Sequence, residues 1–260
     1  MIESIIDGSV ARFTIRRPEV GNAMRGVDVA ELAKGVRDAL ANPAVRVLVI
    51  AGEGPKFFCT GGDLRELSEG FADIGLHIRK WHDLVDLIEA AEKPVIAALN
   101  GHAVGGGLEL ALACHLRFAA SNSRMGLPEL KVGSFPSAGG VRRLTRLLGS
   151  AVALDLVLSA DLWTADVALA KGLVHAVCPA DQLEQRIADM IERLTSFEAN
   201  AVRSVLVCAR AAALDIDSVE LEISLLRECY QTPANRTRLQ AFMDQLGDAK
   251  ASRSNKELRS

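Results

Sequence analysis

The chain has 260 residues, of which 49% are hydrophobic and 24% are charged, and its formal net charge at pH 7 is −3. A chain of this length buries a large core in one domain, or in one domain with a small appendage. The weakly negative charge argues against a nucleic-acid partner. No apolar stretch is long enough to cross a bilayer without charges, so we expect no membrane partner either.

The five cysteines are spread along the chain without a Cys-x-x-Cys pair; they are Cys59, Cys114, Cys178, Cys208 and Cys229. An odd, scattered set indicates free thiols in a reducing compartment rather than a disulfide framework. The N-terminal residues also lack the basic segment and the apolar run of a signal peptide. We therefore expect a cytoplasmic protein.

The first half of the chain alternates between extended and helical patterns. In chain order, the patterns predict a strand at 9–16 after the hairpin signal Asp7-Gly8, a helix at 27–40, an apolar strand at 45–50, a glycine-bearing loop at 52–62, a short helix from Asp63, a helix at 73–91, a buried strand at 95–99, a glycine-rich turn at 100–107 and a helix at 108–114. A strand, a glycine-rich loop and a helix start thus occur twice in succession. This alternation favours an α/β sheet.

The second half is almost wholly helical. After a strand at 115–120 and a turn-like segment at 124–127, helices are predicted at 141–148, 151–158, 164–171, 183–194, 199–214, 219–228 and 235–246, with one further strand at 174–177. The pattern predicts an α/β core over residues 1–195 and a helical C-terminal region over residues 196–260. Apolar helix faces such as that of 199–214 exceed what one core covers, so we expect a homo-oligomer.

Two glycine loops each follow a strand and open a helix; they are Cys59-Thr60-Gly61-Gly62-Asp63 and Val104-Gly105-Gly106-Gly107-Leu108. The first N–H groups of a helix lack intrahelical acceptors and lie at the positive end of its dipole. Two such groups aimed at one point hold a developing oxyanion, at about 3–4 kcal/mol per donor. Plain tight turns explain the same glycines, and the nucleotide motifs are absent. Spacing alone leaves both interpretations open.

Two glutamates lie beside these loops. Glu109 is one turn into the helix that the second glycine loop opens, and Glu129 follows Pro128 after the turn-like segment. Each one alone is a favourable charge in a first helical turn. Together they are candidates for acid–base chemistry, because neighbouring carboxylates have raised and coupled pKa values. Whether the two side chains meet in space does not follow from the sequence.

Ordered motifs extend from about Ser9 to about Phe242. They are Arg17-Pro18 with Asn22-Ala23-Met24, Lys56-Phe57-Phe58-Cys59-Thr60-Gly61-Gly62-Asp63-Leu64, Lys93-Pro94-Val95-Ile96-Ala97-Ala98-Leu99-Asn100-Gly101, Gly105-Gly106-Gly107-Leu108-Glu109-Leu110-Ala111, Leu127-Pro128-Glu129, Phe135-Pro136-Ser137-Ala138-Gly139-Gly140, Arg143-Leu144-Thr145-Arg146 and Ala170-Lys171-Gly172-Leu173-Val174. This set closely resembles the crotonase superfamily of enoyl-CoA hydratases and isomerases. Several motifs in one order and at consistent spacing make a chance agreement negligible.

The resemblance implies a fold and an assembly. The expected fold is a crotonase-like spiral of ββα units followed by a helical C-terminal trimerisation region, commonly assembled as a hexamer from two trimers. It also implies an acyl-CoA substrate and an enoyl-CoA hydratase activity, in which water adds across the double bond of an acyl thioester. Coenzyme A is then part of the substrate, and the reaction requires neither a metal nor a redox cofactor.

The resemblance also assigns roles to individual residues. Gly62 and Gly106 match the two residues whose N–H groups hold the thioester oxygen. Glu109 matches the carboxylate that activates water, and Glu129 matches the one that exchanges a proton with the Cα atom of the substrate. The residues implied to bind coenzyme A or the acyl group are Val20, Thr60, Gly61, Asp63, Leu64 and Ser137.

The chain departs from the family pattern at four positions, which are Leu127, Ser137, His115 and Gln245. A hydroxyl at Ser137 lies where the acyl chain is expected, and Gln245 replaces a lysine that reaches coenzyme A in some hydratases. An isomerase, a thioester hydrolase or a lyase within the family therefore stays an alternative, as does a non-catalytic acyl-CoA-binding or assembly protein. Two intact glutamates favour the hydratase.

Other reactive residue types have simpler interpretations. Cys59 is expected to be a small buried residue rather than a nucleophile, because no base stands near it in the sequence. His77 and His82 are five residues apart, which does not fit the spacing of a helical metal pair. Trp81 and Trp163 are expected to be packing anchors, and His115 is expected to be structural.

Overall fold

The computed structural model describes residues 1–68, 74–214, 219–231, 233–235, 237–238 and 240–241. The chain forms two compact units, Met1–Ser196 and Phe197–Ser260. The first unit is α/β and contains every residue predicted to belong to the site. In the second unit, the described elements are helical. No helix among the described residues is both long and apolar enough to cross a membrane.

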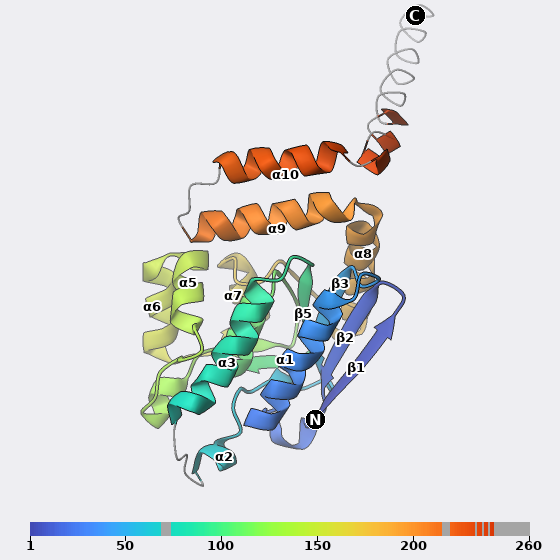
Figure 1. Ribbon diagram of the computed structural model, residues 1–260. Coiled ribbons are helices and arrows are strands. Elements are labelled where there is room, and N and C mark those ends of the chain that lie inside the picture. The colour runs from blue at the N-terminus through green and yellow to red at the C-terminus, as the bar shows by residue number, and fades with distance from the viewer. Residues whose placement is uncertain (69–73, 215–218, 232, 236, 239, 242–260) are drawn as a thin grey trace, which may run out of the picture. The chain divides into compact units, whose positions relative to one another are not determined.

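The first unit contains a six-stranded sheet, of which β1, β2, β3 and β5 are labelled in Figure 1. Its strands, in spatial order, are β1 (Ile2–Asp7), β2 (Val10–Ile15), β3 (Val47–Gly52), β5 (Val95–Leu99), β7 (Leu116–Ala120) and β10 (Ala176–Cys178). Only β1 runs antiparallel to its neighbour, β2. The hairpin signal Asp7-Gly8 joins these two strands, and Gly8 has a φ of 54° that favours glycine.

A second, four-stranded sheet contains short strands in the order β4 (Phe57–Cys59), β6 (His102–Val104), β8 (Arg124–Gly126) and β9 (Trp163–Thr164). From β3 to β8, successive strands of the chain alternate between the two sheets. The order β3–β4–helix, β5–β6–helix, β7–β8–helix is therefore a repeated ββα unit, and the predicted crotonase-like spiral is confirmed.

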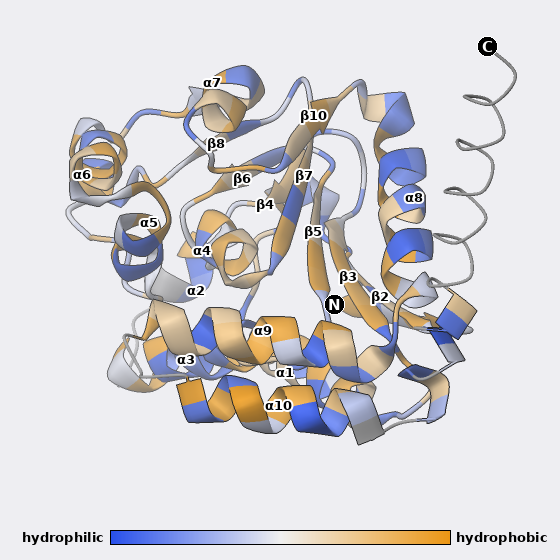
Figure 2. Ribbon diagram, turned by 90° about the horizontal axis from the view of Figure 1, so that it is seen from above, coloured by the Kyte–Doolittle hydropathy of each residue, from blue (hydrophilic) through white to orange (hydrophobic). Residues whose placement is uncertain are grey.

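The helices of the first unit follow the predicted positions closely. They are α1 (Gly26–Ala41), α2 (Leu64–Ser68), α3 (Ile74–Glu89), α4 (Gly106–Ala113), α5 (Gly140–Leu148), α6 (Ser150–Ser159), α7 (Ala165–Ala170) and α8 (Leu183–Ser196), with 3₁₀ turns η1 (Pro18–Val20), η2 (Glu129–Val132) and η3 (Ala180–Gln182). Figure 2 shows α4 on one face of the six-stranded sheet and α8 on the other.

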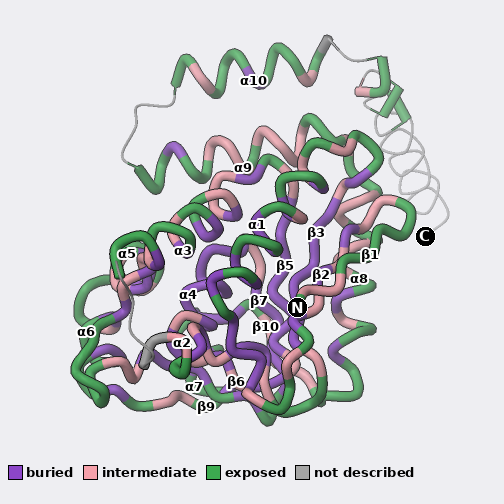
Figure 3. The backbone as a smooth tube through the Cα atoms, turned by 60° about the horizontal axis from the view of Figure 1, so that its bottom comes forward, coloured by how far each residue is buried: buried purple, intermediate pink, exposed green. Residues whose placement is uncertain are grey.

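Both faces of the six-stranded sheet are buried at its central strands β3 and β5, whereas the edge strand β1 is largely exposed. On β3, Leu48 and Ile50 belong to the large core beneath α1, α3 and α4, whereas Val47 and Val49 pack in the smaller core beneath α8. This explains why the strand is apolar throughout rather than alternating. Helix α4 is also buried, from Gly107 to Ala113 (Figure 3).

The sequence interpretation was wrong about the connections. The turn-like segment at Arg124–Leu127 contains strand β8, the loop at 52–62 contains β4, and the glycine-rich turn at 100–107 contains β6. These strands have only three residues, which is too few for an alternating pattern to appear. They are defined by pairing with strands that are distant in the chain, such as Ala103 with Met125.

The second unit contains α9 (Ala199–Ala213) and α10 (Val219–Gln231). Arg203 on α9 pairs with Glu228 on α10 at 3.3 Å. The helix predicted at 235–246 lies only partly within the described residues, and Phe242 and Gln245 lie outside them. The contact that Gln245 was predicted to affect is therefore not described.

Candidate active site

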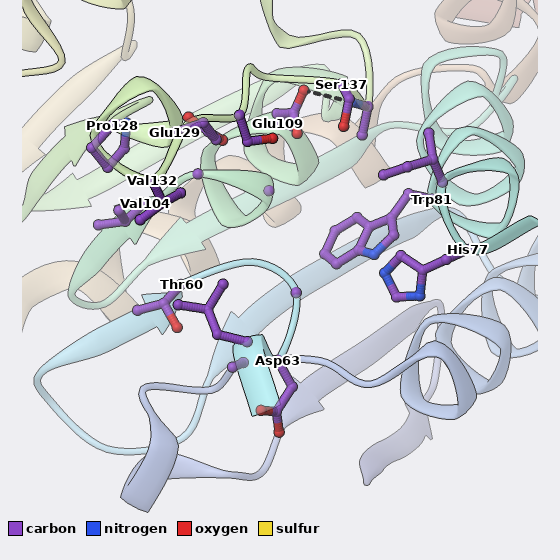
Figure 4. Close-up of a pocket in the computed structure, with 18 of the residues that line it drawn as sticks. Thr60, Asp63, His77, Trp81, Val104, Glu109, Pro128, Glu129, Val132 and Ser137 are labelled. Carbon is purple, nitrogen blue, oxygen red and sulfur yellow. Dashed lines mark hydrogen bonds between the residues drawn. The ribbon is translucent and has the colours of Figure 1, made fainter. Parts of the chain in front are cut away.

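A cavity of about 880 Å³ lies between the glycine loops, α3 and the segment that follows β8 (Figure 4). Of the residues predicted to belong to the site, those that line it are Val20, Thr60, Gly62, Asp63, Leu64, Gly106, Glu109, Glu129 and Ser137. Gly61 is not part of the lining. The structure thus brings together residues that are up to 117 positions apart in the chain, from Val20 to Ser137.

The two glycine loops touch each other at the cavity. Gly61 has a φ of 94°, and a Cβ atom added there would lie 2.7 Å from the backbone nitrogen of Gly106. Glycine is therefore required on steric grounds as well as conformational ones. Within the described part of the chain, neither the Gly62 N–H nor the Gly106 N–H has an acceptor in the protein. Both donors remain available to a ligand in the cavity.

Glu109 extends from the first turn of α4 into a buried environment, with 3% of the residue exposed. Its Oε1 atom accepts hydrogen bonds from the backbone N–H groups of Ala138, at 2.8 Å, and Gly140, at 2.7 Å. Burial raises the pKa of Glu109 to about 7; repulsion from Glu129 adds to this, and the two N–H donors oppose it. A carboxyl group with this pKa accepts and releases protons near neutral pH.

Glu129 is the first residue of η2. It was predicted to lie in the first turn of a helix, and that helix is a 3₁₀ turn. Burial raises the pKa of Glu129 above its ordinary value. Its Oε2 atom is buried and has no hydrogen-bond partner among the described residues. A Cβ atom added to Gly105 would lie 3.1 Å from Oε1, so this glycine lets the carboxylate approach the second glycine loop.

Asp63 lines the cavity, but its carboxylate is held from within the protein. Arg17 donates to Asp63 Oδ2 at 2.8 Å and to the Ala23 carbonyl at 2.7 Å. The pKa of Asp63 lies below its ordinary value: burial raises it, but the hydrogen bonds from Arg17 and from the Arg65 N–H, together with the charges of both arginines, outweigh burial. Arg17, which belongs to the motif Arg17-Pro18, therefore anchors the first glycine loop through Asp63.

Three further residues of the site were missed or interpreted differently. Trp81 was expected only to pack, yet it lines the cavity, and a Cβ atom on Gly106 would lie 3.3 Å from its ring. Ala138 and Gly140 hold Glu109, although the sequence marked them only as part of a motif. A Cβ atom on Gly140 would lie 2.8 Å from Glu109 Oε1. The glycine pair at 139–140 was therefore the feature of the sequence that could have indicated a close approach of another group to this backbone.

Cys59 and His115 have the structural environments that the simpler interpretations predicted. Cys59 is buried outside the cavity lining, and burial raises the pKa of its thiol to about 12, which opposes a role as a nucleophile. His115 is a structural residue whose Nδ1 accepts from the Val95 N–H at 3.0 Å. Burial lowers the pKa of His115 to about 4, so it is neutral at physiological pH. His77 lines the cavity, whereas His82 does not.

Comparison with known proteins agrees with this fold and identifies the family. Residues 6–248 match the enoyl-CoA hydratase/isomerase family, and the chain belongs to that family. It is 35% identical to the crotonyl-CoA hydratase of Syntrophomonas wolfei over 244 residues, covering 90% of this chain and 92% of that protein. It is also 35% identical to the (E)-benzylidenesuccinyl-CoA hydratase of Thauera aromatica over 224 residues, covering 82% of each chain.

A solved structure shows the same likeness in three dimensions. An enoyl-CoA hydratase from Bacillus anthracis superposes with a TM-score of 0.87 at 29% identity, covering 94% of this chain and 96% of the other. The protein is thus a crotonase-family α/β protein, similar to enoyl-CoA hydratases over nearly its whole length.

Proposed function

We propose that the protein is an enoyl-CoA hydratase that adds water to a 2-enoyl-CoA thioester and gives the 3-hydroxyacyl-CoA. One observation carries this proposal. Two carboxyl groups with raised pKa values, Glu109 and Glu129, line the same cavity as two glycine N–H groups that have no acceptor among the described residues. Acid–base catalysis at a conjugated thioester requires this combination.

In the proposed reaction the thioester oxygen accepts hydrogen bonds from the Gly62 and Gly106 N–H groups. Glu109 starts as the carboxylate and Glu129 as the acid. Glu109 takes a proton from water while the water oxygen forms a bond to Cβ, and the π electrons move toward the thioester oxygen. The enolate then takes a proton at Cα from Glu129, which completes the addition of water. Proton exchange with solvent removes the proton from Glu109 and returns one to Glu129, so both groups regain their starting forms.

The remaining lining residues are assigned to binding. The part of the cavity proposed for the pantetheine arm of coenzyme A is lined by Val20, Thr60, Asp63 and Leu64. Gly61 belongs to the same loop but does not line the cavity; it packs against Gly106. Ser137 also lines the cavity, and we assign it to the part proposed for the acyl group. We place the protein in the cytoplasm because its five cysteines are an odd, scattered set without a Cys-x-x-Cys pair, which is typical of a reducing compartment.

Membership of the family does not specify which acyl group the substrate carries. One relative is named for crotonyl-CoA and another for (E)-benzylidenesuccinyl-CoA, which are very different substrates at the same 35% identity. The alternative reaction is isomerisation of the double bond, for which one carboxylate that moves a proton is sufficient. The presence of both glutamates in one cavity favours hydration over isomerisation.

The test is absorbance at the enoyl-thioester band during incubation with crotonyl-CoA. Loss of the band with formation of 3-hydroxybutyryl-CoA supports the hydratase. A shifted double bond in a 3-enoyl-CoA substrate without water uptake would instead identify an isomerase. Saturable binding without any turnover, across a panel of acyl groups, would identify the non-catalytic acyl-CoA-binding protein.

We expect the activity to depend on pH through Glu109. Its pKa is raised to about 7, so the carboxylate that must accept a proton from water is lost as the pH falls through that value. The value of kcat should therefore decline on the acid side of neutrality. A pH profile of kcat measures this, and a profile that stays flat through neutral and mildly acidic pH in a folded protein would contradict the role of Glu109.

We propose a homo-oligomer, as a trimer or a hexamer of two trimers, with residues 196–260 as the oligomerisation region. In the described part of the second unit, large apolar side chains are exposed on α9, on α10 and next to them; they are Val205, Leu214, Val219, Ile223, Leu226 and Tyr230. Exposed apolar side chains gathered in this number indicate an interface. Sedimentation at micromolar concentration should give a multiple of 27.8 kDa, and the mass of a single chain would contradict the assembly.

A further inference from the structure

Arg143 is a buried cation that contacts the segment holding Glu109 and does not line the cavity itself. It lies on α5, and only 3% of its surface is exposed. Its Nη1 atom donates to the Ala138 carbonyl at 2.9 Å. The N–H of the same residue donates to Glu109 Oε1 at 2.8 Å. A single residue, Ala138, therefore connects the guanidinium to the carboxylate.

Two acidic side chains of α3 fix the other side of the guanidinium. Arg143 Nη2 donates to Asp86 at 2.6 Å and to Glu89 at 2.7 Å. A buried guanidinium is stable only when it is paired and hydrogen-bonded, so these contacts determine where it lies. Helix α3 also carries Trp81, which packs against Gly106. Through Arg143, the segment that holds Glu109 is tied to the helix that packs against the second glycine loop.

The backbone between Ala138 and α5 is shaped around the guanidinium. Gly139 has a φ of 90°, and a Cβ atom added there would lie 2.3 Å from Arg143 Nη1. The positive φ favours glycine in this turn, and the missing Cβ leaves room for the guanidinium in the position it takes here. The turn directs the Gly140 N–H to the Glu109 carboxylate, 2.7 Å away.

The charged groups around Glu109 come from several elements. Glu129 of η2 raises the pKa of Glu109, and Arg143 of α5 lowers it. On α3, Asp86 and Glu89 are paired with the arginines of α5, and His77 lines the cavity. On β6, the His102 imidazole accepts a hydrogen bond from the Arg124 N–H.

We propose that Arg143 is a positioning residue for the hydration reaction. It holds Ala138 and the turn at 138–140 so that Glu109 Oε1 is bound to the backbone and Oε2 is the oxygen left to accept a proton from water. This inference rests on the proposed function, because it gives Arg143 a role only through Glu109. It acts without touching the substrate.

The test compares three variants of the full-length protein. Arg143→Met removes the contact with Ala138, and Arg143→Lys keeps the charge with one donor group instead of a planar fork. Arg142→Met is the matched control, because Arg142 pairs with the same Asp86, at 2.8 Å, yet is half exposed and bonds to the acid rather than to Ala138. Circular dichroism and melting temperature establish that each variant is folded.

For Arg143→Met we expect kcat to fall by about a hundredfold, the scale for a catalytic group misplaced by about 1 Å. KM should change little, and the acid limb of the pH profile should move to higher pH because a cation near Glu109 is lost. Arg143→Lys should recover part of kcat. Arg142→Met should keep the parental kcat and pH profile. Parental values for a folded Arg143→Met, or equal losses in both methionine variants, would overturn the inference.

A second measurement requires no substrate. Amide hydrogen exchange of a peptide spanning 134–144 reports the Ala138 and Gly140 N–H groups, which the Glu109 carboxylate protects. Exchange there should accelerate in both Arg143 variants, more in Arg143→Met, and not in Arg142→Met. If the parent protein does not hydrate any enoyl-CoA, the proposed function fails while this measurement still decides whether Arg143 holds the turn. Unchanged exchange in Arg143→Lys and Arg143→Met would refute the structural link itself.

Discussion

Replacing Glu109 or Glu129 by glutamine is expected to lower kcat for hydration of crotonyl-CoA by at least about a hundredfold, the usual scale for a positioned acid or base. Glutamine has the same size and keeps an acceptor oxygen, but it neither takes up nor releases a proton. In Glu109→Gln the Ala138 and Gly140 N–H groups still have an oxygen to bind. The loss therefore reports proton transfer rather than a collapsed site.

The matched control is Glu19→Gln. Glu19 also lines the cavity, but it is exposed, and no carboxylate chemistry is assigned to it. The same isosteric change there should leave kcat near the parental value. If Glu109→Gln or Glu129→Gln hydrated crotonyl-CoA as fast as the control variant, the assignment of that glutamate would be wrong.

The two glutamine variants should also differ in mechanism. Glu109→Gln removes the group whose pKa is near 7, so the acid limb of the pH profile should disappear along with most of the activity. Glu129→Gln should retain an acid limb, displaced to lower pH, because repulsion from Glu129 no longer raises the pKa of Glu109. Exchange of the Cα proton of the hydroxyacyl product with solvent should be lost in Glu129→Gln, since that glutamate is assigned to Cα.

Gly106→Pro is expected to lower kcat by about a hundredfold to a thousandfold, the scale for one missing oxyanion donor. Proline has no N–H, so one of the two donors aimed at the thioester oxygen is removed. Gly106 is the first residue of α4, a position at which proline is compatible with a helix. The helix itself should therefore survive, and the effect should appear in kcat.

Ser150→Pro is the control for this substitution. Ser150 is the first residue of α6, and it follows a glycine with positive φ as Gly106 does: Gly149 has a φ of 79° and Gly105 a φ of 58°. It is exposed and lies outside the cavity lining. A native circular dichroism spectrum is required of both variants. If folded Gly106→Pro turned over substrate like Ser150→Pro, Gly106 would only form a turn.

Gly106→Ala tests the complementary point, because it keeps the N–H and adds only a methyl group. That Cβ would lie 3.2 Å from Gly61 Cα and 3.3 Å from the Trp81 ring, so it is tight but can be accommodated by a small shift. A branched side chain such as valine would not fit. We expect Gly106→Ala to retain far more activity than Gly106→Pro.

Much of the fold was predictable from local pattern. The strand predicted at 95–99 is β5, and the helix predicted at 27–40 is α1 with one added residue at each end. These elements have enough residues for their apolar spacing to be distinctive. The three-residue strands of the second sheet have no such spacing, and only their pairing with distant residues defines them.

The candidate site was likewise predictable in part from the sequence and decided in part by the tertiary structure. The amino-acid sequence by itself determined the family, the two glutamates and the two glycine loops, because residue types in a fixed order carry that information. Only the tertiary structure decided that Glu109 is buried with its Oε1 on amides 29 and 31 residues away, and that Arg143 holds one of those residues. The pKa of a carboxyl group depends on burial and on nearby charges in space. Those quantities arise from long-range packing, which leaves no periodic trace in the sequence.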